Sequence, residues 1–286
     1  MKGKIAMRTL KVLIDGLAFP EGPRWHDGRF HFSDMHAHQV VAVDMAGKRE
    51  IVCDVPGRPS GLGWLPDGRM LVVSMTDRKL MRLDRDGLKT VADMSKLAPF
   101  DCNDMVVDAH GRAYVGNFGF DLHAGETPRG TTLVMVAPDG VARVVAEDMM
   151  FPNGMVITPD GKTLIVAETF GRRLTAFDIG ADGALSNRRA WADLGSSLPD
   201  GICLDSENAI WVACPTASEA IRVKQGGEVV ERIKVETDAF ACMLGGPDGR
   251  TLFVATAPNS DPEKCRATRG GRIETTRVEV PRAGLP

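Results

Sequence analysis

The sequence predicts an all-β fold, a six-bladed β-propeller formed by a single domain over residues 1 to 286. Three observations support this prediction: a short polar motif that recurs at regular spacing, glycine turns that recur in phase with it, and apolar runs beside each turn. The chain has 31 glycines in 286 residues. Glycine-rich turns between short strands are typical of all-β proteins.

The recurring motif is Pro-X-Gly, in which X is a polar residue at the start of an expected strand. It occurs as Phe19-Pro20-Glu21-Gly22, Phe151-Pro152-Asn153-Gly154 and Leu198-Pro199-Asp200-Gly201. With a fourth copy, Pro59-Ser60-Gly61, and two looser copies that lack the flanking Pro and Gly, the X positions are Glu21, Ser60, Asn103, Asn153, Asp200 and Cys242. Their spacing of 39 to 50 residues is the period of propeller blades with four strands each.

A turn follows each motif, six or seven residues after its X position. Asp-Gly or a similar pair stands at 27–28, 67–68, 110–111, 160–161 and 248–249, with Glu207-Asn208 in the fifth repeat. An apolar run follows at 70–73, 113–115, 163–166 and 251–254, and a third strand is expected at 40–44, 79–83, 132–136 and 174–178. Apolar runs on both sides of such turns predict β-hairpins.

The last blade is expected to be closed by the start of the chain, because an unpaired edge strand promotes aggregation. Residues 272–280 alternate like a strand after the sixth turn, and residues 10–14 form a short apolar strand after a loose start at residues 1 to 9. We expect the strand at 10–14 to complete the sixth blade.

The longest interval contains an expected lid. Its additional residues lie at 117–130 and include Phe118, Phe120, Asp121 and His123. Long loops in compact domains are often functional, and the aromatic residues favour a lid over a disordered segment.

Composition and charge exclude several classes of function. The net charge is −3 with both signs interspersed, so no nucleic-acid partner and no membrane partner is expected. Residues 1 to 20 lack the apolar region of a signal peptide, and we expect a cytoplasmic protein. The six scattered cysteines are expected to be reduced packing residues, and His36-Ala37-His38 is interpreted as a solvated turn.

The X residues are expected to meet around the mouth of the central channel. Two carboxylates, Glu21 and Asp200, would then face one narrow space, where unpaired charges are costly. A bound cation would remove this cost, because it pairs with both negative charges. Glu21, Asn153 and Asp200, with Asn103 as a possible fourth ligand, offer oxygen donors, which suit calcium, magnesium or manganese. Carboxylates also bind zinc and iron(II).

With these motifs the chain resembles the SMP-30/gluconolactonase/regucalcin-like lactonases, six-bladed propellers with one central divalent metal. The resemblance rests on the three Pro-X-Gly motifs above, on Cys102-Asn103-Asp104 and on residues 242–248. It implies that Glu21, Asn153 and Asp200 bind the metal and that Asp200 is the general base. It also implies that Asn103 contacts substrate or completes the metal shell and that Asp121 occupies an acidic lid position.

The implied activity is metal-dependent hydrolysis of a small lactone, with substrate contacts from Asn103, Asp101, Asp121, Phe118 and His123. Sugar-lactone members of the family usually carry Arg two residues before the Asn at 103, whereas this chain has Asp101. The reversed charge favours another lactone or a neutral ester. Two alternatives stay open, a metal-dependent esterase or phosphotriesterase on the same ring and a propeller that binds calcium or a partner without turnover.

Overall fold

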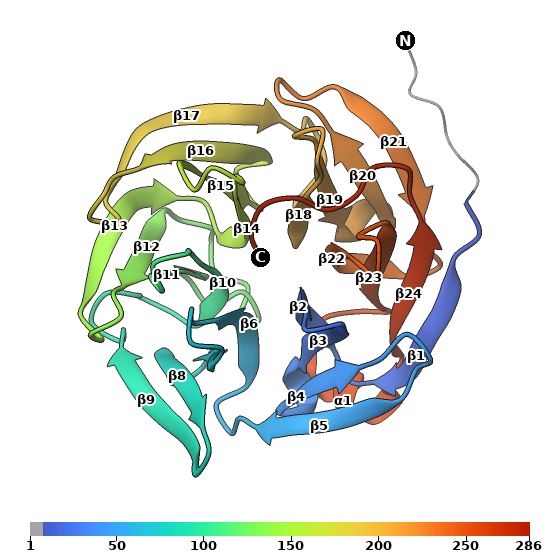
Figure 1. Cartoon of the computed structure of the whole chain (residues 1–286), viewed down its shortest axis with the longest axis horizontal. Helices are drawn as coiled ribbons and strands as arrows, with labels where there is room; N and C mark the ends of the chain where they lie inside the picture. The colour runs from blue at the N-terminus through green and yellow to red at the C-terminus, as the bar shows by residue number, and fades with distance from the viewer. Residues whose placement is uncertain (1–7) are drawn as a thin grey trace.

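The computed structural model describes residues 8–286, and residues 1–7 of the expected loose start lie outside this range. Six antiparallel sheets of four strands surround a central channel (Figure 1), which confirms the predicted six-bladed propeller. We number the blades 1 to 6 by their innermost strands in chain order, β2, β6, β10, β14, β18 and β22. These strands contact one another around the channel.

Blades 1 to 3 follow the chain from the channel outwards. Their strands are β2 (Pro20–His26), β3 (Arg29–Asp34), β4 (Gln39–Val43), β5 (Arg49–Asp54), β6 (Pro59–Trp64), β7 (Met70–Ser74), β8 (Lys79–Asp84), β9 (Gly87–Asp93), β10 (Cys102–Val107), β11 (Ala113–Asn117), β12 (Thr131–Val136) and β13 (Ala142–Met149). A short 3-10 helix, η1 (Met35–Ala37), connects β3 to β4.

Blades 4 and 5 repeat this order and blade 6 closes the ring. Their strands are β14 (Pro152–Ile157), β15 (Thr163–Glu168), β16 (Arg173–Ile179), β17 (Leu185–Asp193), β18 (Ile202–Leu204), β19 (Ile210–Cys214), β20 (Glu219–Val223), β21 (Val229–Lys234), β22 (Asp238–Gly245), β23 (Thr251–Ala257), β24 (Gly271–Arg277) and β1 (Lys11–Leu17). A 3-10 helix, η2 (Pro215–Ala217), follows β19, and α1 (Pro262–Thr268) precedes β24.

The predicted closure by the start of the chain is confirmed. β1 pairs antiparallel with β24, and Lys11 lies opposite Thr275. The sixth sheet therefore combines the first strand of the chain with its last three.

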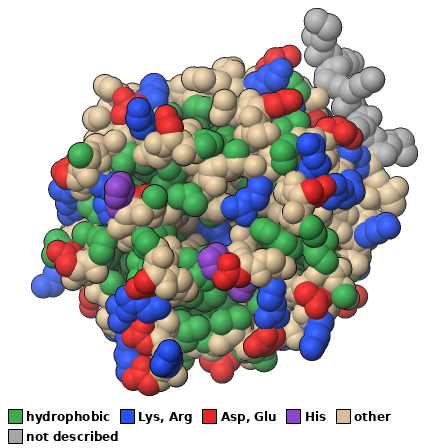
Figure 2. All heavy atoms as spheres, in the orientation of Figure 1, with side chains coloured by type: hydrophobic (Ala, Val, Ile, Leu, Met, Phe, Trp, Pro, Cys, Tyr) green, Lys and Arg blue, Asp and Glu red, His purple; other side chains and the backbone are tan. Residues whose placement is uncertain are grey.

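The core lies mainly between neighbouring blades, where apolar side chains of adjacent sheets interdigitate. Trp211 on β19, for example, is 1% exposed and packs in one cluster with β22 and β23 of the next blade. All six cysteines are free thiols, as expected. On the face shown in Figure 2, acidic and basic side chains are interspersed. No helix within residues 8–286 is long and apolar enough to cross a membrane.

The end of the chain covers one mouth of the channel (Figure 1). Leu285 and Ile157 at the end of β14 exchange two backbone hydrogen bonds of 2.9 and 2.8 Å, and the Ala283 N–H donates to Leu204 at the end of β18. The side chain of Arg282 donates to the backbone oxygen of Trp25 on β2. This segment, residues 281–286, ties the far ends of three inner strands together.

Candidate metal centre and substrate cavity

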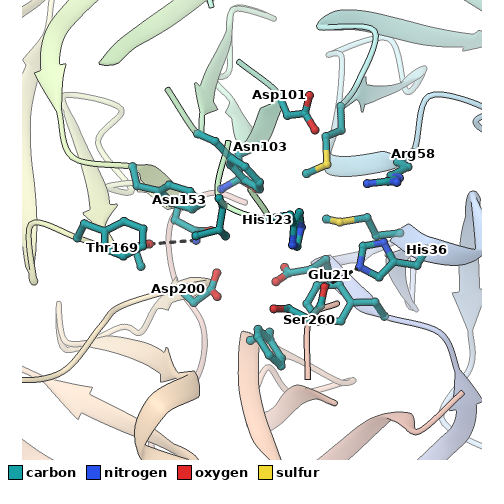
Figure 3. Close-up of a pocket in the computed structure, with 18 residues that line it drawn as sticks. Glu21, His36, Arg58, Asp101, Asn103, His123, Asn153, Thr169, Asp200 and Ser260 are labelled. Atoms are coloured by element: carbon teal, nitrogen blue, oxygen red, sulfur yellow. Dashed lines mark hydrogen bonds between the residues drawn. The ribbon is translucent and has the colours of Figure 1, made fainter. Parts of the chain in front are cut away.

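The other mouth of the channel is a cavity at the point where the inner strands begin (Figure 3). It contains about 690 Å³ of empty space, part of which is open to solvent, and Glu21, Asn103, Asn153 and Asp200 lie in its wall. The structure therefore brings four of the six predicted ring residues together. Asp200 lies two residues before the start of β18, and the other three lie at the second residue of their strands.

The remaining two ring positions differ from the prediction. Ser60 is buried beside the cavity and its hydroxyl faces Asn103 at 3.4 Å. Cys242 is also buried, with its sulfur 3.5 Å from the backbone oxygen of Gly201. Phe240 lines the cavity in its place, so assigning Cys242 to the ring was wrong by two residues. The sixth repeat lacks the Pro and Gly that define the register in the other blades.

The glycine of the Pro-X-Gly motif allows the inner strands to approach closely. A Cβ atom at Gly154 would lie 2.5 Å from the backbone nitrogen of Ile202 in the next blade, and one at Gly22 would lie 2.5 Å from the backbone oxygen of Ser60. Real side chains do not fit at such distances. The motif therefore encodes contact between blades and fixes each X residue at the mouth of the channel.

The two carboxyl groups of the ring lie in an unfavourable environment for negative charge. Burial raises the pKa of Glu21 to about 8, although the Gly22 N–H donates to its Oε2 at 2.9 Å. Burial also raises the pKa of Asp200 well above its ordinary value, and the charge of Glu21 raises it further. Two partly buried carboxylates that repel each other are stabilised by a cation between them.

The two asparagines are held by neighbouring blades. The Asn153 amide nitrogen donates to the Thr169 hydroxyl at 3.2 Å, and that hydroxyl donates to the backbone oxygen of Pro199 at 2.8 Å. This chain of bonds assigns the amide orientation and leaves the Asn153 oxygen without a partner in the described part of the chain. Asn103 lies between the Ser60 hydroxyl and the backbone oxygen of Pro152, both at 3.4 Å.

These residues fit a hard divalent cation. Two carboxylates with raised pKa values and a free amide oxygen form an all-oxygen donor set, which calcium, magnesium and manganese prefer. No group of three or more His, Cys, Asp or Glu side chains that could hold a metal ion occurs within residues 8–286. The proposed set contains only two residues of these types, since its third ligand is Asn153.

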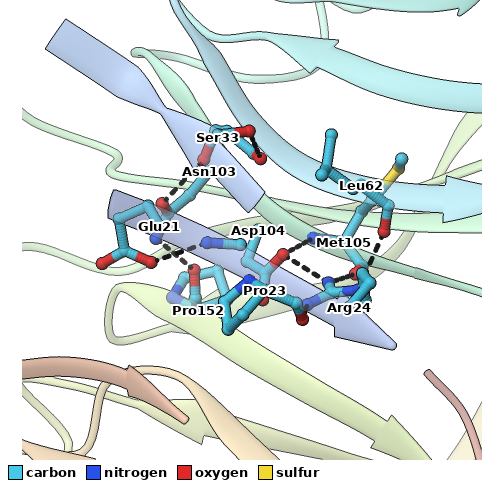
Figure 4. A network of polar contacts seen from close by, with 11 residues as sticks. Glu21, Pro23, Arg24, Ser33, Leu62, Asn103, Asp104, Met105 and Pro152 are labelled. Carbon is cyan, nitrogen blue, oxygen red and sulfur yellow. Dashed lines mark hydrogen bonds and ion pairs between the residues drawn. The ribbon is translucent and has the colours of Figure 1, made fainter. Parts of the chain in front are cut away.

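A buried ion pair beneath the ring was not predicted from the sequence (Figure 4). Arg24 Nη2 lies 2.6 Å from Asp104 Oδ1, and both side chains are less than a tenth exposed. Arg24 also donates to the backbone oxygens of Leu62 at 2.9 Å and Met105 at 2.5 Å. It thereby joins blades 1, 2 and 3 inside the channel. The arginine of Phe19-Pro20-Glu21-Gly22-Pro23-Arg24 was visible in the sequence, but its partner is 80 residues away.

The loop expected to form a lid contributes to the cavity wall. Phe118, Leu122 and His123 line the cavity, and Phe118 stacks on Phe151 with ring centres 4.4 Å apart. Asp121 is not among the cavity-lining residues. Its carboxylate accepts a hydrogen bond of 2.9 Å from the Ala124 N–H, so it supports a turn of the loop, and its contact with substrate stays a prediction.

Asp101 lies in the wall near Arg58, a residue that the sequence analysis did not select (Figure 3). Burial raises the pKa of Asp101, and the charge of Arg58 opposes this rise. Arg58 immediately precedes the start of β6 and has a left-handed backbone with φ of 63°. No sequence signal distinguished it from the other arginines, because its position depends on this backbone turn.

The interpretation of His36 as part of a solvated turn was wrong. Its side chain is 2% exposed, lines the cavity and stacks on Phe19 with ring centres 4.9 Å apart. His36 Nε2 lies 3.2 Å from the backbone oxygen of Ser260, which precedes α1. Burial lowers the pKa of His36 to about 4, so this wall residue is neutral at neutral pH.

Residues 19–258 match the SMP-30/Gluconolactonase/LRE-like region. The chain belongs to this family. It is 25% identical to regucalcin from Xenopus laevis over 94% of each chain. It is 26% identical to the pentonolactonase of Haloferax volcanii over 88% of this chain and 86% of the relative.

Solved structures support the fold. Regucalcin from Agrobacterium tumefaciens, named a calcium-binding protein, superposes with a TM-score of 0.82 at 22% identity, covering 99% of this chain and 98% of that one. The expected family and fold are thus confirmed. Lactonases hydrolyse ester bonds, and the expected class, a hydrolase of ester bonds, is confirmed at that level. The cytoplasmic location stays a prediction.

Proposed function

We propose that this protein is a metal-dependent lactonase that opens a small cyclic ester in the cavity at the mouth of the channel. The observation that carries the proposal is the meeting of Glu21, Asn153 and Asp200, two carboxylates with raised pKa values and one free amide oxygen, in a single cavity. The lactonase among the relatives supports the same reaction class.

Glu21, Asn153 and Asp200 would hold one divalent ion, for which calcium is our first expectation and zinc, manganese, magnesium or iron(II) are the alternatives. When bound, such an ion polarises an ester carbonyl and lowers the pKa of a water molecule. Asp200 is the general base, which accepts the proton of the attacking water. Asn103, held between two blades, donates to or accepts from the substrate ring.

Removal of either carboxylate should abolish activity without unfolding the protein. Asp200→Asn is expected to lower kcat about a hundredfold or more, since positioned proton transfer contributes about that factor. Glu21→Gln is expected to abolish turnover because it removes one of the two carboxylates that would hold the ion. Acid release from a lactone panel would be measured with protein stripped by a chelator and refilled with each ion in turn. Full activity of either variant would refute the assigned roles.

Two controls accompany this experiment. Asp27→Asn removes a carboxylate whose side chain is 88% exposed, at the turn after β2, and should leave activity unchanged. Without metal, Asp200→Asn should unfold at the same temperature as the parent or at a higher one, because it removes one of two repelling buried charges. The panel would include paraoxon, so that turnover of this phosphotriester alone would favour the phosphotriesterase alternative. Ion binding without turnover of any substrate would favour the alternative of a propeller that binds calcium or a partner and is not an enzyme.

A further inference from the structure

The wall above the carboxylates is unusually rich in aromatic side chains. Five phenylalanines line the cavity, namely Phe19, Phe118, Phe151, Phe170 and Phe240. None of them was selected from the sequence as a ring residue, and only Phe118 was expected to touch substrate. Met35, Met75 and Leu122 add further apolar surface to the same wall.

These phenylalanines form two groups on opposite sides of the channel. Phe118 and Phe170 pack on Phe151 with ring centres 4.4 and 5.3 Å away, and all three belong to blades 3 and 4. Phe19 and Phe240 pack edge to face at 4.7 Å and belong to blades 1 and 6. In a ring of six, blades 3 and 4 lie across from blades 6 and 1. The carboxylates therefore lie at the bottom of a slot with aromatic sides.

Such a slot binds flat apolar groups and disfavours polyhydroxylated ones. Aromatic faces gain free energy when an apolar ring displaces water from them. A sugar ring between the same faces would lose the hydration of the hydroxyl groups that point at the phenylalanines, and the phenyl rings offer these hydroxyls no hydrogen-bond partners. The sides of the slot therefore select the body of the substrate, while the ring of carboxylates acts on its ester.

The polar groups of the wall that are free to contact a ligand have little net charge. No hydrogen bond or ion pair is formed by the side chains of Arg58, Asp101 and His123 with other residues in the range 8–286. Arg58 and Asp101 carry opposite charges and influence each other. Together they favour a neutral group that can hydrogen bond, such as a hydroxyl or carbonyl, over an anion or a cation.

We propose that the cavity selects neutral ring compounds with a flat apolar body, held between the phenylalanines of blades 3 and 4 and those of blades 1 and 6. This inference rests on the proposed function for the reaction, and it makes the substrate an aromatic or alkyl-substituted lactone and not a sugar lactone.

Turnover of three δ-lactones with the same ester ring tests this selection. The refilled protein would be assayed with δ-valerolactone, its phenyl-substituted form and glucono-δ-lactone. We expect a kcat/KM for the phenyl lactone about tenfold or more above both others, as burial of one face of a phenyl ring would give. Equal or better turnover of glucono-δ-lactone would overturn the inference and leave the lactonase proposal intact.

A matched pair of variants links the selection to the slot. Phe170→Ala should lower kcat/KM for the phenyl lactone about tenfold more than kcat/KM for δ-valerolactone, and so remove most of the phenyl preference. Phe100→Ala is the control, because Phe100 is also half-buried but does not line the cavity. A phenyl preference that survives in Phe170→Ala, or is lost equally in Phe100→Ala, would contradict the assignment.

Binding of lactams tests the aromatic slot independently of the proposed lactonase activity. Lactams replace the ring oxygen by N–H and resist hydrolysis, so calorimetry can compare phenyl-substituted δ-valerolactam with gluconolactam even if no lactone is turned over. Tighter binding of the phenyl lactam by about tenfold, lost in Phe170→Ala, would support the slot and leave only the chemistry to be revised. Equal binding of the two lactams would overturn the slot.

Discussion

Arg24 shows how a single side chain supports the candidate site from below. It lies inside the channel, pairs with Asp104 and donates to backbone oxygens of two other blades. Its pair lies beneath Glu21, and the charge of Asp104 helps to raise the pKa of Glu21. The arginine therefore compensates negative charge in the part of the channel where the structure concentrates it.

Replacement of this arginine should destabilise the protein strongly. Arg24→Met leaves the buried Asp104 carboxylate without its partner, and the expected loss is about 3–5 kcal/mol in the free energy of unfolding. Urea denaturation measures it. Arg29→Met is the matched control, because Arg29 pairs with the exposed Glu50 and such surface pairs contribute about 0–1 kcal/mol. Similar losses in both variants would show that the buried pair is not a major contributor.

His31 should make stability depend on pH. It lies on β3, is 9% exposed, and its Nδ1 has no hydrogen-bond partner in the described part of the chain. Burial, with a smaller contribution from His26, lowers its pKa from 6.5 to about 4. The unfolded chain therefore binds more protons between these pH values, and the folded state loses stability as pH falls through this window.

The variant His31→Gln isolates this effect, since all other titrating groups are shared with the parent. Its stability relative to the parent should rise as pH falls from neutral to about 4, by at most about 3 kcal/mol. Urea denaturation across this range measures the difference. A stability difference that does not change with pH would show that His31 titrates normally in the folded protein.

The residues that the sequence did not reveal share one physical cause. Glu21, Asn153 and Asp200 could be found because each stands in a Pro-X-Gly motif whose glycine is required by the close approach of neighbouring strands. His36 and Arg58 carry no such local signal. Their places in the wall depend on contacts with Phe19 and Ser260 and on a left-handed backbone, which are properties of the folded chain.

Among the elements, the strands were predictable and the short helix was not predicted. Alternating apolar runs beside Asp-Gly turns placed the hairpins within a few residues of β7, β15 and β23. α1 was missed, although its start carries an ordinary signal. Asp261 accepts a hydrogen bond from the Lys264 N–H as the N-cap, and Pro262 occupies the first turn. The helix is an insertion between β23 and β24, which lies outside the repeating strand pattern.

The segment 281–286 is an element whose effect can be tested by removal. Deletion of residues 282–286 loses five hydrogen bonds to blades 1, 4, 5 and 6. At a net contribution of about 0.5–1 kcal/mol for each bond, the protein should lose about 3–5 kcal/mol of stability. Arg282→Ala is the control, because it retains the four backbone bonds.

The deletion should also increase acrylamide quenching of Trp25 and Trp64, which line a pocket under this segment. Unchanged stability and quenching would show that the segment binds only loosely.

At the scale of the whole molecule, the architecture followed from periodicity alone. A motif with four full and two looser copies, at a spacing near that of one blade, specified the number of blades, four of the six ring positions and the need for closure. The aromatic slot could not be predicted in the same way. It arises because blades far apart in the sequence face each other across the channel, which only the closed ring establishes.

The closure by β1 has a consequence for the synthesis of this protein. Lys11 and its partner Thr275 are 264 residues apart, so the first strand must wait for nearly the whole chain to leave the ribosome. Bringing together ends so distant costs about 5 kcal/mol of chain entropy. Glu21 in blade 1 and Asp200 in blade 5 are neighbours only across blade 6, which this last pairing completes. A translation product truncated before β24 therefore contains every predicted metal ligand but lacks the closed ring that brings these ligands together.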